Sequence, residues 1–121
     1  MTQERKTLTI MLMTSPYMFE NTKTAMKITE AALAKGYRVK LFAMADAVHN
    51  FTTGQKPQGV PNPEEGFKKL IDKGLIVELC GTCLHFRGIS EEQLMENTEA
   101  SSLRGLSETM KESDVFITLS F

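Results

Sequence analysis

Two cysteines, Cys80 and Cys83, are the residues of this 121-residue chain whose type and spacing point most directly to chemistry. In a C-x-x-C spacing, the second thiol can attack a disulfide or persulfide that forms on the first. The thiolate is the reactive form of cysteine, and a helix N-terminus or a nearby cation favours it. The alternative is structural, because free cysteines often pack in protein cores as small apolar side chains.

Two basic side chains follow the cysteines closely in the sequence. Arg87, which precedes Gly88, can present its guanidinium to an anion such as a sulfur-bearing carboxylate. His85 can tune a neighbouring thiol. Both residues have an equally simple interpretation as solvated surface side chains. We therefore take Cys80, Cys83 and Arg87 as the candidate catalytic residues and leave the role of His85 open.

Other kinds of site find little support in the sequence. The cysteines and the two histidines, His49 and His85, lack the second well-spaced ligand pair that a structural zinc site requires. Residues 54–57 do not match the glycine-rich loop that binds nucleotide phosphates. We therefore expect neither a metal nor a cofactor.

The composition excludes several classes of partner. The chain has 14 Lys and Arg against 15 Asp and Glu, and its formal charge of -1 leaves no surplus to attract nucleic acid or an anionic membrane surface. Its 41% hydrophobic and 24% charged residues are typical of a globular protein, and its length suits one domain over residues 1–121. No apolar stretch approaches the roughly 20 residues of a spanning helix, and the first residues lack a signal-peptide pattern. We therefore expect a cytoplasmic protein, in which reducing conditions favour thiol chemistry over a structural disulfide.

The hydrophobic pattern that must position these residues predicts strands alternating with helices. Residues 8–13 are apolar without alternation, which is typical of a strand covered on both faces. Within residues 37–44, apolar side chains alternate with Arg38 and Lys40, which indicates a strand with one face only partly buried. We expect this strand nearer a sheet edge. Further strands are predicted over 75–79, 98–100 and 115–119, the last one buried. Helices are predicted over 21–35, 63–73, 91–95 and 103–110, and residues 46–51 are compatible with a short helix within the loop region that follows residue 45. The alternation implies a three-layer α/β/α domain with a mostly parallel five-stranded sheet.

This fold class predicts where the reactive group lies. In an open parallel sheet, reactive groups gather beyond the carboxyl ends of the strands. Cys80 follows directly on the strand predicted over residues 75–79, which makes it the leading candidate for the nucleophile. Cys83 falls in the following turn, and we expect it to be the more shielded of the two thiols.

The cysteine segment, Cys80–Ser90 with the sequence CGTCLHFRGIS, resembles that of the DsrE/DsrF family, especially its YchN-like branch, in which Cys-x-Thr-Cys is followed by Arg-Gly-Ile. Three further segments are similar to that branch: Ser15–Tyr17, Met44–Val48 with the following Gly54–Pro57, and Ser113–Phe121. They occur in the same order, and the resemblance therefore spans nearly the whole chain.

The resemblance implies a function that the residues alone leave open. In the sulfur-relay members of the family, the cysteine that matches Cys80 carries a persulfide sulfur between partner proteins. This implies a persulfide-carrying, sulfurtransferase-like protein with Cys80 as the sulfur acceptor and with sulfur donor and acceptor proteins as partners. Cys83 has no counterpart in those members. The alternatives are a dithiol redox protein or sensor that uses both cysteines, and a non-catalytic oligomeric binding module.

The resemblance also implies assembly into trimers or hexamers, with the cysteine loop near the subunit boundaries. The sequence supports a homo-oligomer independently. Phe51, Val60 and Phe86 fall in predicted loops, where a monomer would leave apolar side chains exposed.

Overall fold

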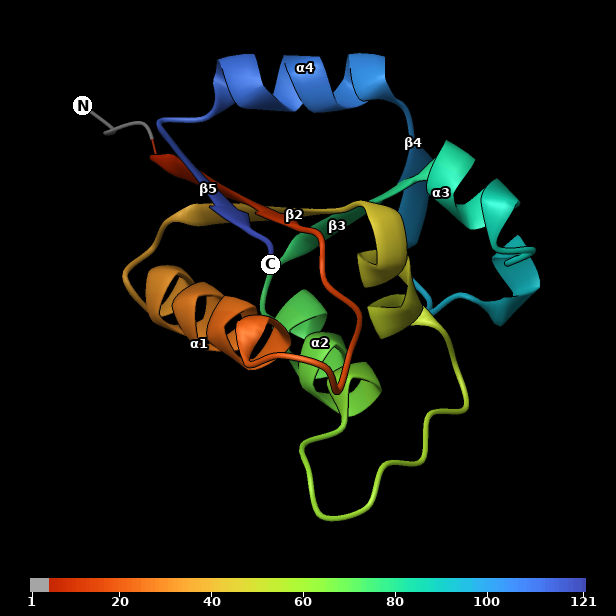
Figure 1. The fold of residues 1–121 in the computed structure, drawn as a ribbon. Helices are drawn as coiled ribbons and strands as arrows, with labels where there is room; N and C mark the ends of the chain where they lie inside the picture. The colour runs from red at the N-terminus through yellow and green to blue at the C-terminus, as the bar shows by residue number, and fades with distance from the viewer. Residues whose placement is uncertain (1–4) are drawn as a thin grey trace.

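The computed structural model describes residues 5–121, in which strands and helices alternate along the chain (Figure 1). The elements are β1 (Thr7–Leu12), α1 (Asn21–Ala34), β2 (Arg38–Ala43), the 3-10 helix η1 (Ala45–Phe51), α2 (Pro63–Asp72), β3 (Ile76–Cys80), α3 (Gly81–Phe86), the 3-10 helix η2 (Glu91–Gln93), β4 (Thr98–Ser101), α4 (Leu103–Glu112) and β5 (Val115–Leu119). The five strands form one sheet in the order β4-β3-β2-β1-β5, and every pair of neighbours is parallel. The predicted α/β class with a five-stranded sheet is confirmed, and the sheet is wholly parallel.

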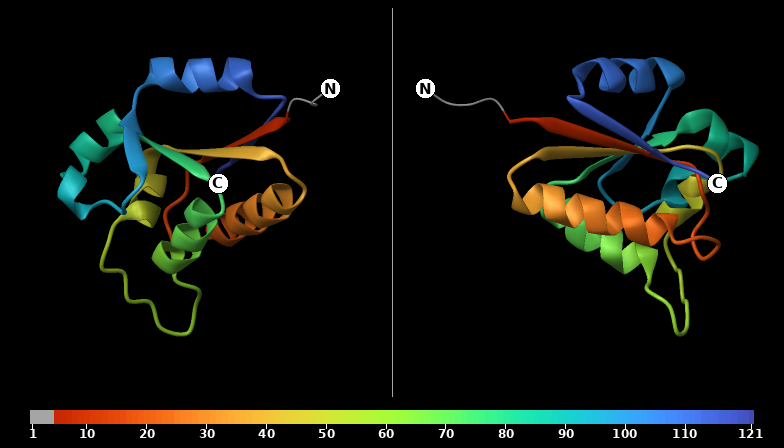
Figure 2. Two further views of the ribbon diagram at one scale, coloured as in Figure 1. Left: turned by 180° about the vertical axis from the view of Figure 1, so that it is seen from behind. Right: turned by 60° about the vertical axis from the view of Figure 1, so that its left-hand side comes forward.

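Helices lie on both sides of the sheet and complete the three layers. The views in Figures 1 and 2 show α1 and α2 against one face and α4 across the other. The short helix α3 lies beyond the carboxyl end of β3, next to η1. Among the helices of residues 5–121, none has both the length and the apolar character that crossing a bilayer requires.

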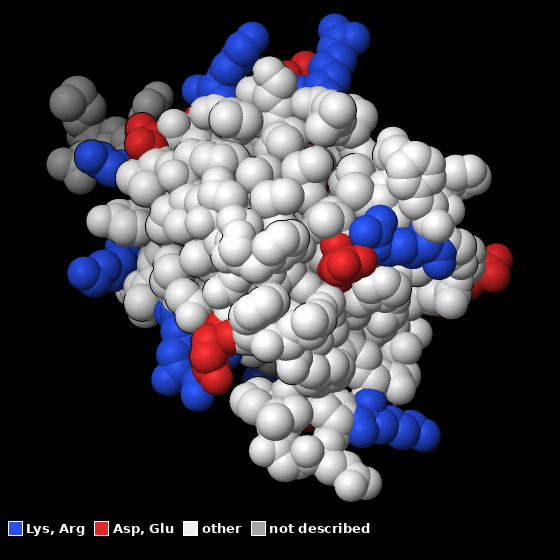
Figure 3. Space-filling model, in the orientation of Figure 1, with Lys and Arg blue, Asp and Glu red and all other residues white. Residues whose placement is uncertain are grey.

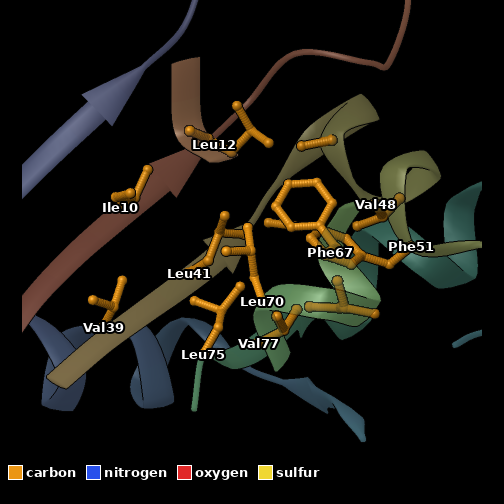
Figure 4. Close-up of a cluster of buried hydrophobic side chains, with 14 of the residues drawn as sticks. Ile10, Leu12, Val39, Leu41, Val48, Phe51, Phe67, Leu70, Leu75 and Val77 are labelled. Carbon is orange, nitrogen blue, oxygen red and sulfur yellow. The ribbon is translucent and has the colours of Figure 1, made fainter. Parts of the chain in front are cut away.

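The main core lies between the sheet and the layer formed by α1, α2 and η1. Figure 4 shows side chains from the strands, such as Ile10 and Leu41, facing side chains from α2 and η1. The rings of Phe51 and Phe67 are in contact, with their centroids 4.6 Å apart. Phe51 is fully buried, and the prediction that it lies exposed in a loop is therefore wrong, because η1 turns it inward against α2. Val60 and Phe86 are exposed as predicted.

The opposite face of the sheet has a thinner cover. Its buried apolar cluster consists of Phe42, Cys80 and Leu106, and α4 supplies only the last of these three. Met110 of α4 is 48% exposed because α4 is a single short helix over a wide sheet. This face therefore buries much less apolar surface than the face that α1 and α2 cover.

Two strand positions differ from the sequence predictions. The strand with Arg38 and Lys40, predicted nearer an edge, is β2, and it is the middle strand of the sheet. Lys40 is tolerated there because its ammonium extends over the thinly covered face to the Glu112 carboxylate of α4, 3.4 Å away. β5, predicted as buried, is an edge strand, and its Val115 is 52% exposed.

The predicted ends of α2 are confirmed in detail. The Asn62 side-chain oxygen accepts hydrogen bonds from the backbone N–H groups of Glu64 and Glu65, at 2.9 and 3.4 Å. Pro63 is the first helical residue, where its missing N–H costs nothing. Gly74, at φ +116, follows the helix in a conformation that L side chains rarely adopt. These local signals fix where α2 begins and ends, and hence where β3 starts.

The stability of the main core can be tested at its aromatic contact. We expect Phe67→Ala to lower the free energy of unfolding by about 3–5 kcal/mol, because it leaves a cavity beside Phe51. Phe86→Ala is the matched control, since Phe86 is 79% exposed, and it should change that free energy by less than about 0.5 kcal/mol. Urea denaturation of the two variants makes the comparison. Equal losses of unfolding free energy in the two variants would contradict the assignment of the main core to the face that α1 and α2 cover.

Candidate functional site

The site is built where β2 and β3 end side by side. Ala43 pairs with Leu79 in the last register position of these parallel strands. Beyond that pair, one chain turns into η1 at Ala45, and the other passes through Cys80 into α3. A Cβ at Gly81 would lie 3.1 Å from the Ser101 carbonyl oxygen, which explains why a glycine begins the helix next to β4. The two turns therefore meet at one edge of the sheet, as the fold class predicts.

Cys80 is the sheltered thiol of the pair. It is only 5% exposed and belongs to the cluster with Phe42 and Leu106 under α4. Its Sγ accepts a hydrogen bond from the backbone N–H of Cys83 at 3.3 Å, so that Cys80 caps α3. Burial raises the pKa of the Cys80 thiol and the adjacent Cys83 thiol adds to this rise, while the backbone N–H groups of Cys83 and Thr82 act in the opposite direction. Cys80 is therefore mostly protonated at neutral pH.

Cys83 is the more accessible thiol. Its side chain is partly exposed, and its Sγ accepts a hydrogen bond from the backbone N–H of Ala45 at 3.2 Å. The prediction that Cys83 is the more shielded residue is wrong. The reason is that the turn of α3 carries Cys83 toward η1 and the solvent, whereas Cys80, still on β3, points under α4. The Cys83 side chain still packs against the cluster that contains Cys80.

Ala45 holds its N–H toward Cys83 in an uncommon backbone conformation. Its φ is +54, in the left-handed region, which only Tyr17 and Asn97 share among the non-glycine residues of 5–121. A left-handed alanine is strained, and such strain persists only where the surrounding structure enforces it. The sequence reasoning did not identify Ala45 as a site residue, although it lies in the Met44–Val48 segment of the family resemblance.

Arg87 lies at the site, and its guanidinium is hydrogen-bonded to other groups of the protein. Its Nε donates to Oδ1 of Asp46 at 2.9 Å, and its Nη2 lies 2.8 Å from the same oxygen. Its Nη1 donates to the carbonyl oxygen of Cys83 at 3.1 Å. Arg87 therefore joins the end of α3 to η1, and the structure brings all three predicted site residues together. Asp46, its partner, is a site residue that the sequence reasoning missed, because nothing in the sequence pairs positions so far apart.

The surroundings of the cysteines do not suggest a small-molecule pocket. A hollow of about 560 Å³ lies where α1 begins, lined by residues that include Tyr17, Met26 and Val60, and neither cysteine lines it. Over residues 5–121, no three His, Cys, Asp or Glu side chains are grouped in a way that could hold a metal ion. The arrangement is a pair of thiols, one buried at the end of β3 and one partly exposed on α3, which suits reaction with another molecule's sulfur.

Known proteins resemble this chain in both sequence and structure. The model of the DsrE/DsrF-like family matches residues 6–119. The protein MK0008 of Methanopyrus kandleri is 36% identical over 107 residues, which cover 88% of each chain. The protein MJ0989 of Methanocaldococcus jannaschii is 33% identical over 110 residues, covering 91% of this chain and 96% of the other. Protein YchN of Escherichia coli K12 is 34% identical over 80 residues, covering 66% of this chain and 68% of YchN.

Solved structures agree with these relatives. The crystal structure of YchN from E. coli has a TM-score of 0.89 and 28% identity, with 94% of this chain and 99% of that chain covered. The structure of MTH1491 from Methanobacterium thermoautotrophicum has a TM-score of 0.79 with the same coverage, and its 12% identity makes it evidence for the fold alone. The fold predicted from the sequence is therefore confirmed by two independent structures.

The unequal burial of the thiols predicts their order of alkylation. At pH 7 we expect iodoacetamide to modify Cys83 before Cys80, because Cys80 is buried and its pKa is raised. The rate for Cys80, measured on Cys83→Ser, should keep rising as the pH passes the ordinary thiol pKa of about 8.5. Peptide mass spectrometry over time follows both residues, and Cys80→Ser is the matched control. Faster modification of Cys80 at pH 7 would contradict the geometry.

Proposed function

This chain belongs to the DsrE/DsrF-like family, in its YchN-like branch, and we propose on that basis that it is a sulfur-transfer protein that carries sulfur as a persulfide on Cys80. The family is of the sulfur-relay type. The observation that supports Cys80 most strongly is its place at the carboxyl end of β3, with the backbone N–H of Cys83 donating to its sulfur. Sulfur donor and acceptor proteins are the partners that this function requires.

The burial of the Cys80 thiol suits a residue that carries a persulfide sulfur. A persulfide exposes a reactive outer sulfur, which any thiol in solution can remove by attack. With the thiol 5% exposed, free thiols approach Cys80 with difficulty, while the Cys83 N–H at 3.3 Å can still donate to the inner sulfur. A protected nucleophile is nearly all that persulfide transfer needs, since the covalent intermediate stores the sulfur between two exchanges.

The transfer is an exchange between thiols and persulfides. A donor persulfide R–S–SH gives its outer sulfur to Cys80, so that R–SH leaves and Cys80–S–SH forms. An acceptor thiol then attacks that outer sulfur and restores the Cys80 thiol. No net oxidation takes place, and no cofactor is needed. Arg87 contributes by holding the loop through Asp46 and the Cys83 carbonyl.

The proximity of the two cysteines supports a second candidate function. The Cys83 N–H donates to the Cys80 sulfur at 3.3 Å, and the Cys83 side chain packs against the cluster that contains Cys80, so that Cys83 can attack an oxidised or persulfidated Cys80 and close a disulfide. In that case the chain is a dithiol redox protein or sensor. Retention of sulfur and closure of the disulfide compete at the same pair, and their products differ in mass.

Intact mass spectrometry distinguishes these functions. After reaction with a persulfide donor, we expect the wild type to gain about 32 Da per chain and to keep it, as a covalent carrier must. The gain should last longer in Cys83→Ser, which lacks the neighbouring thiol, should be short-lived in Cys80→Ser, and should be absent from the double variant. A loss of about 2 Da without a persulfide would instead identify the dithiol redox function. If no persulfide donor changes the mass, both chemical functions are overturned, and the non-catalytic binding module is the remaining alternative.

We further propose that the chain forms a homo-oligomer, with trimers or hexamers the expected sizes. Large apolar side chains are exposed along α4, along β5 and at the C-terminus: Leu103, Met110, Val115 and Phe121. Figure 3 shows this side of the molecule with most of its charged side chains toward the margin of the view. An apolar edge strand beside a thinly covered sheet face is a surface that association would bury.

Light scattering tests the assembly. At micromolar concentration we expect a mass that is a multiple of the 13.5 kDa chain. Val115→Lys places a charge on the exposed edge of β5 and should shift the mass toward that of one chain, because a buried unpaired charge disfavours association. Lys73→Glu, outside the apolar surface, is the control. A wild-type monomer at all concentrations would contradict the proposal.

A further inference from the structure

The two thiols differ in how a sulfur donor can reach them. Cys80 is 5% exposed under Phe42 and Leu106, whereas Cys83 is partly exposed on α3. Exchange requires the attacking sulfur to approach the outer sulfur of the donor directly, so the donor's own body must lie just beyond the site. A donor larger than a few atoms meets Cys83 first, and it cannot reach Cys80 without opening the cover of α4.

A line of two backbone hydrogen bonds runs from Ala45 through Cys83 to the sheltered sulfur of Cys80. The Ala45 N–H donates to the Cys83 sulfur at 3.2 Å, and the Cys83 N–H donates to the Cys80 sulfur at 3.3 Å. The Cys83 side chain also packs against the cluster that contains Cys80. Each sulfur therefore has its own backbone donor, and the donors come from two different elements, η1 and α3. The left-handed φ of +54 at Ala45 shows that the surroundings enforce the contact with Cys83.

Arg87 and Asp46 keep the two parts of this line together. Arg87 donates both to Asp46, which follows Ala45 directly, and to the carbonyl of Cys83. The pair thus fixes the turn that carries the Ala45 N–H against the helix that carries the Cys83 thiol. Arg87 and Asp46 act as positioning residues for Cys83, because Arg87 binds the carbonyl oxygen of Cys83 and Asp46 holds the Arg87 guanidinium.

We propose that Cys83 is the residue through which sulfur enters: it takes the outer sulfur from an external persulfide and passes it to Cys80. This inference rests on the proposed carrier function of Cys80 and adds to it the direction of transfer within the pair. The buried Cys80 protects the stored sulfur, and the accessible Cys83 gives the donor a thiol that it can reach.

Both steps balance without an oxidant or reductant. In the first, the Cys83 thiol ionises and its thiolate attacks the outer sulfur of R–S–SH; the S–S bond of the donor breaks, R–S⁻ leaves, and it takes up the proton that Cys83 lost to become R–SH. In the second, Cys80 attacks the outer sulfur of Cys83–S–SH, the bond to the Cys83 sulfur breaks, and the Cys83 thiolate takes the proton that Cys80 loses. The products are Cys80–S–SH and a free Cys83 thiol.

Two donors of different size test the entry role. Loading is followed by quenched intact mass spectrometry with glutathione persulfide, a tripeptide, and with inorganic hydrogen disulfide, which is only a few atoms long. We expect Cys83→Ser to load from glutathione persulfide at least about tenfold more slowly than the wild type, and from the inorganic donor within about threefold of it. Thr82→Ser, at the neighbouring exposed position, is the matched control and should load like the wild type with both donors. Cys80→Ser should accept sulfur at the wild-type rate and lose it quickly.

The outcomes separate this inference from the function on which it rests. If Cys83→Ser loads from glutathione persulfide as fast as the wild type, the entry role is overturned and Cys80 remains the carrier. If Cys80→Ser retains sulfur as long as the wild type, Cys80 is not the carrier and the proposed function itself fails. If Cys83→Ser has the wild-type circular dichroism and loads from neither donor, both fail. Cys83→Ala, which keeps the backbone N–H to Cys80, replaces Cys83→Ser if the serine variant does not fold.

Discussion

The parallel pairing of β2 with β3 is the constraint on which the cysteine site depends. Because Ala43 lies opposite Leu79, the chain leaves both strands at the same level of the sheet. The turn after β2 then delivers the Ala45 N–H to the Cys83 sulfur, and the turn after β3 delivers the Cys83 N–H to the Cys80 sulfur. A shift of this register by one residue would separate the donors from their sulfurs and turn the Cys80 side chain to the other face of the sheet.

The unequal thickness of the two helical layers gives the thiols their different properties. The layer formed by α1 and α2 buries most of the apolar core, and it leaves α4 as a light cover over Cys80. That cover is enough to raise the pKa of Cys80 and to exclude most solvent, while it leaves Cys83 accessible. The same thin layer leaves apolar side chains on α4 and β5 exposed, so the burial of Cys80 and the exposed apolar surface have one structural cause.

Local signals in the sequence predicted the helices and strands. The features that the sequence did not predict depend on contacts between distant segments. The cap at Asn62 and the glycine at Gly74 act within a few residues, and the structure has α2 as they predict. The order of the strands depends on pairing between distant segments, and the charge of Lys40 suggested an edge because its partner, Glu112, lies far along the chain. Likewise, Cys80 was placed correctly at a strand end, but its burial depends on Phe42 and Leu106 from other elements.

The central claim is that retained sulfur resides on Cys80, and the most direct measurement is to locate it. Wild-type protein is loaded with an isotopically labelled persulfide, capped with an alkylating agent, digested and analysed by tandem mass spectrometry. The account predicts that the label retained after removal of the donor is on the peptide sulfur of Cys80. Label retained on Cys83 alone, or an unlabelled disulfide between Cys80 and Cys83 in place of any persulfide, would contradict it.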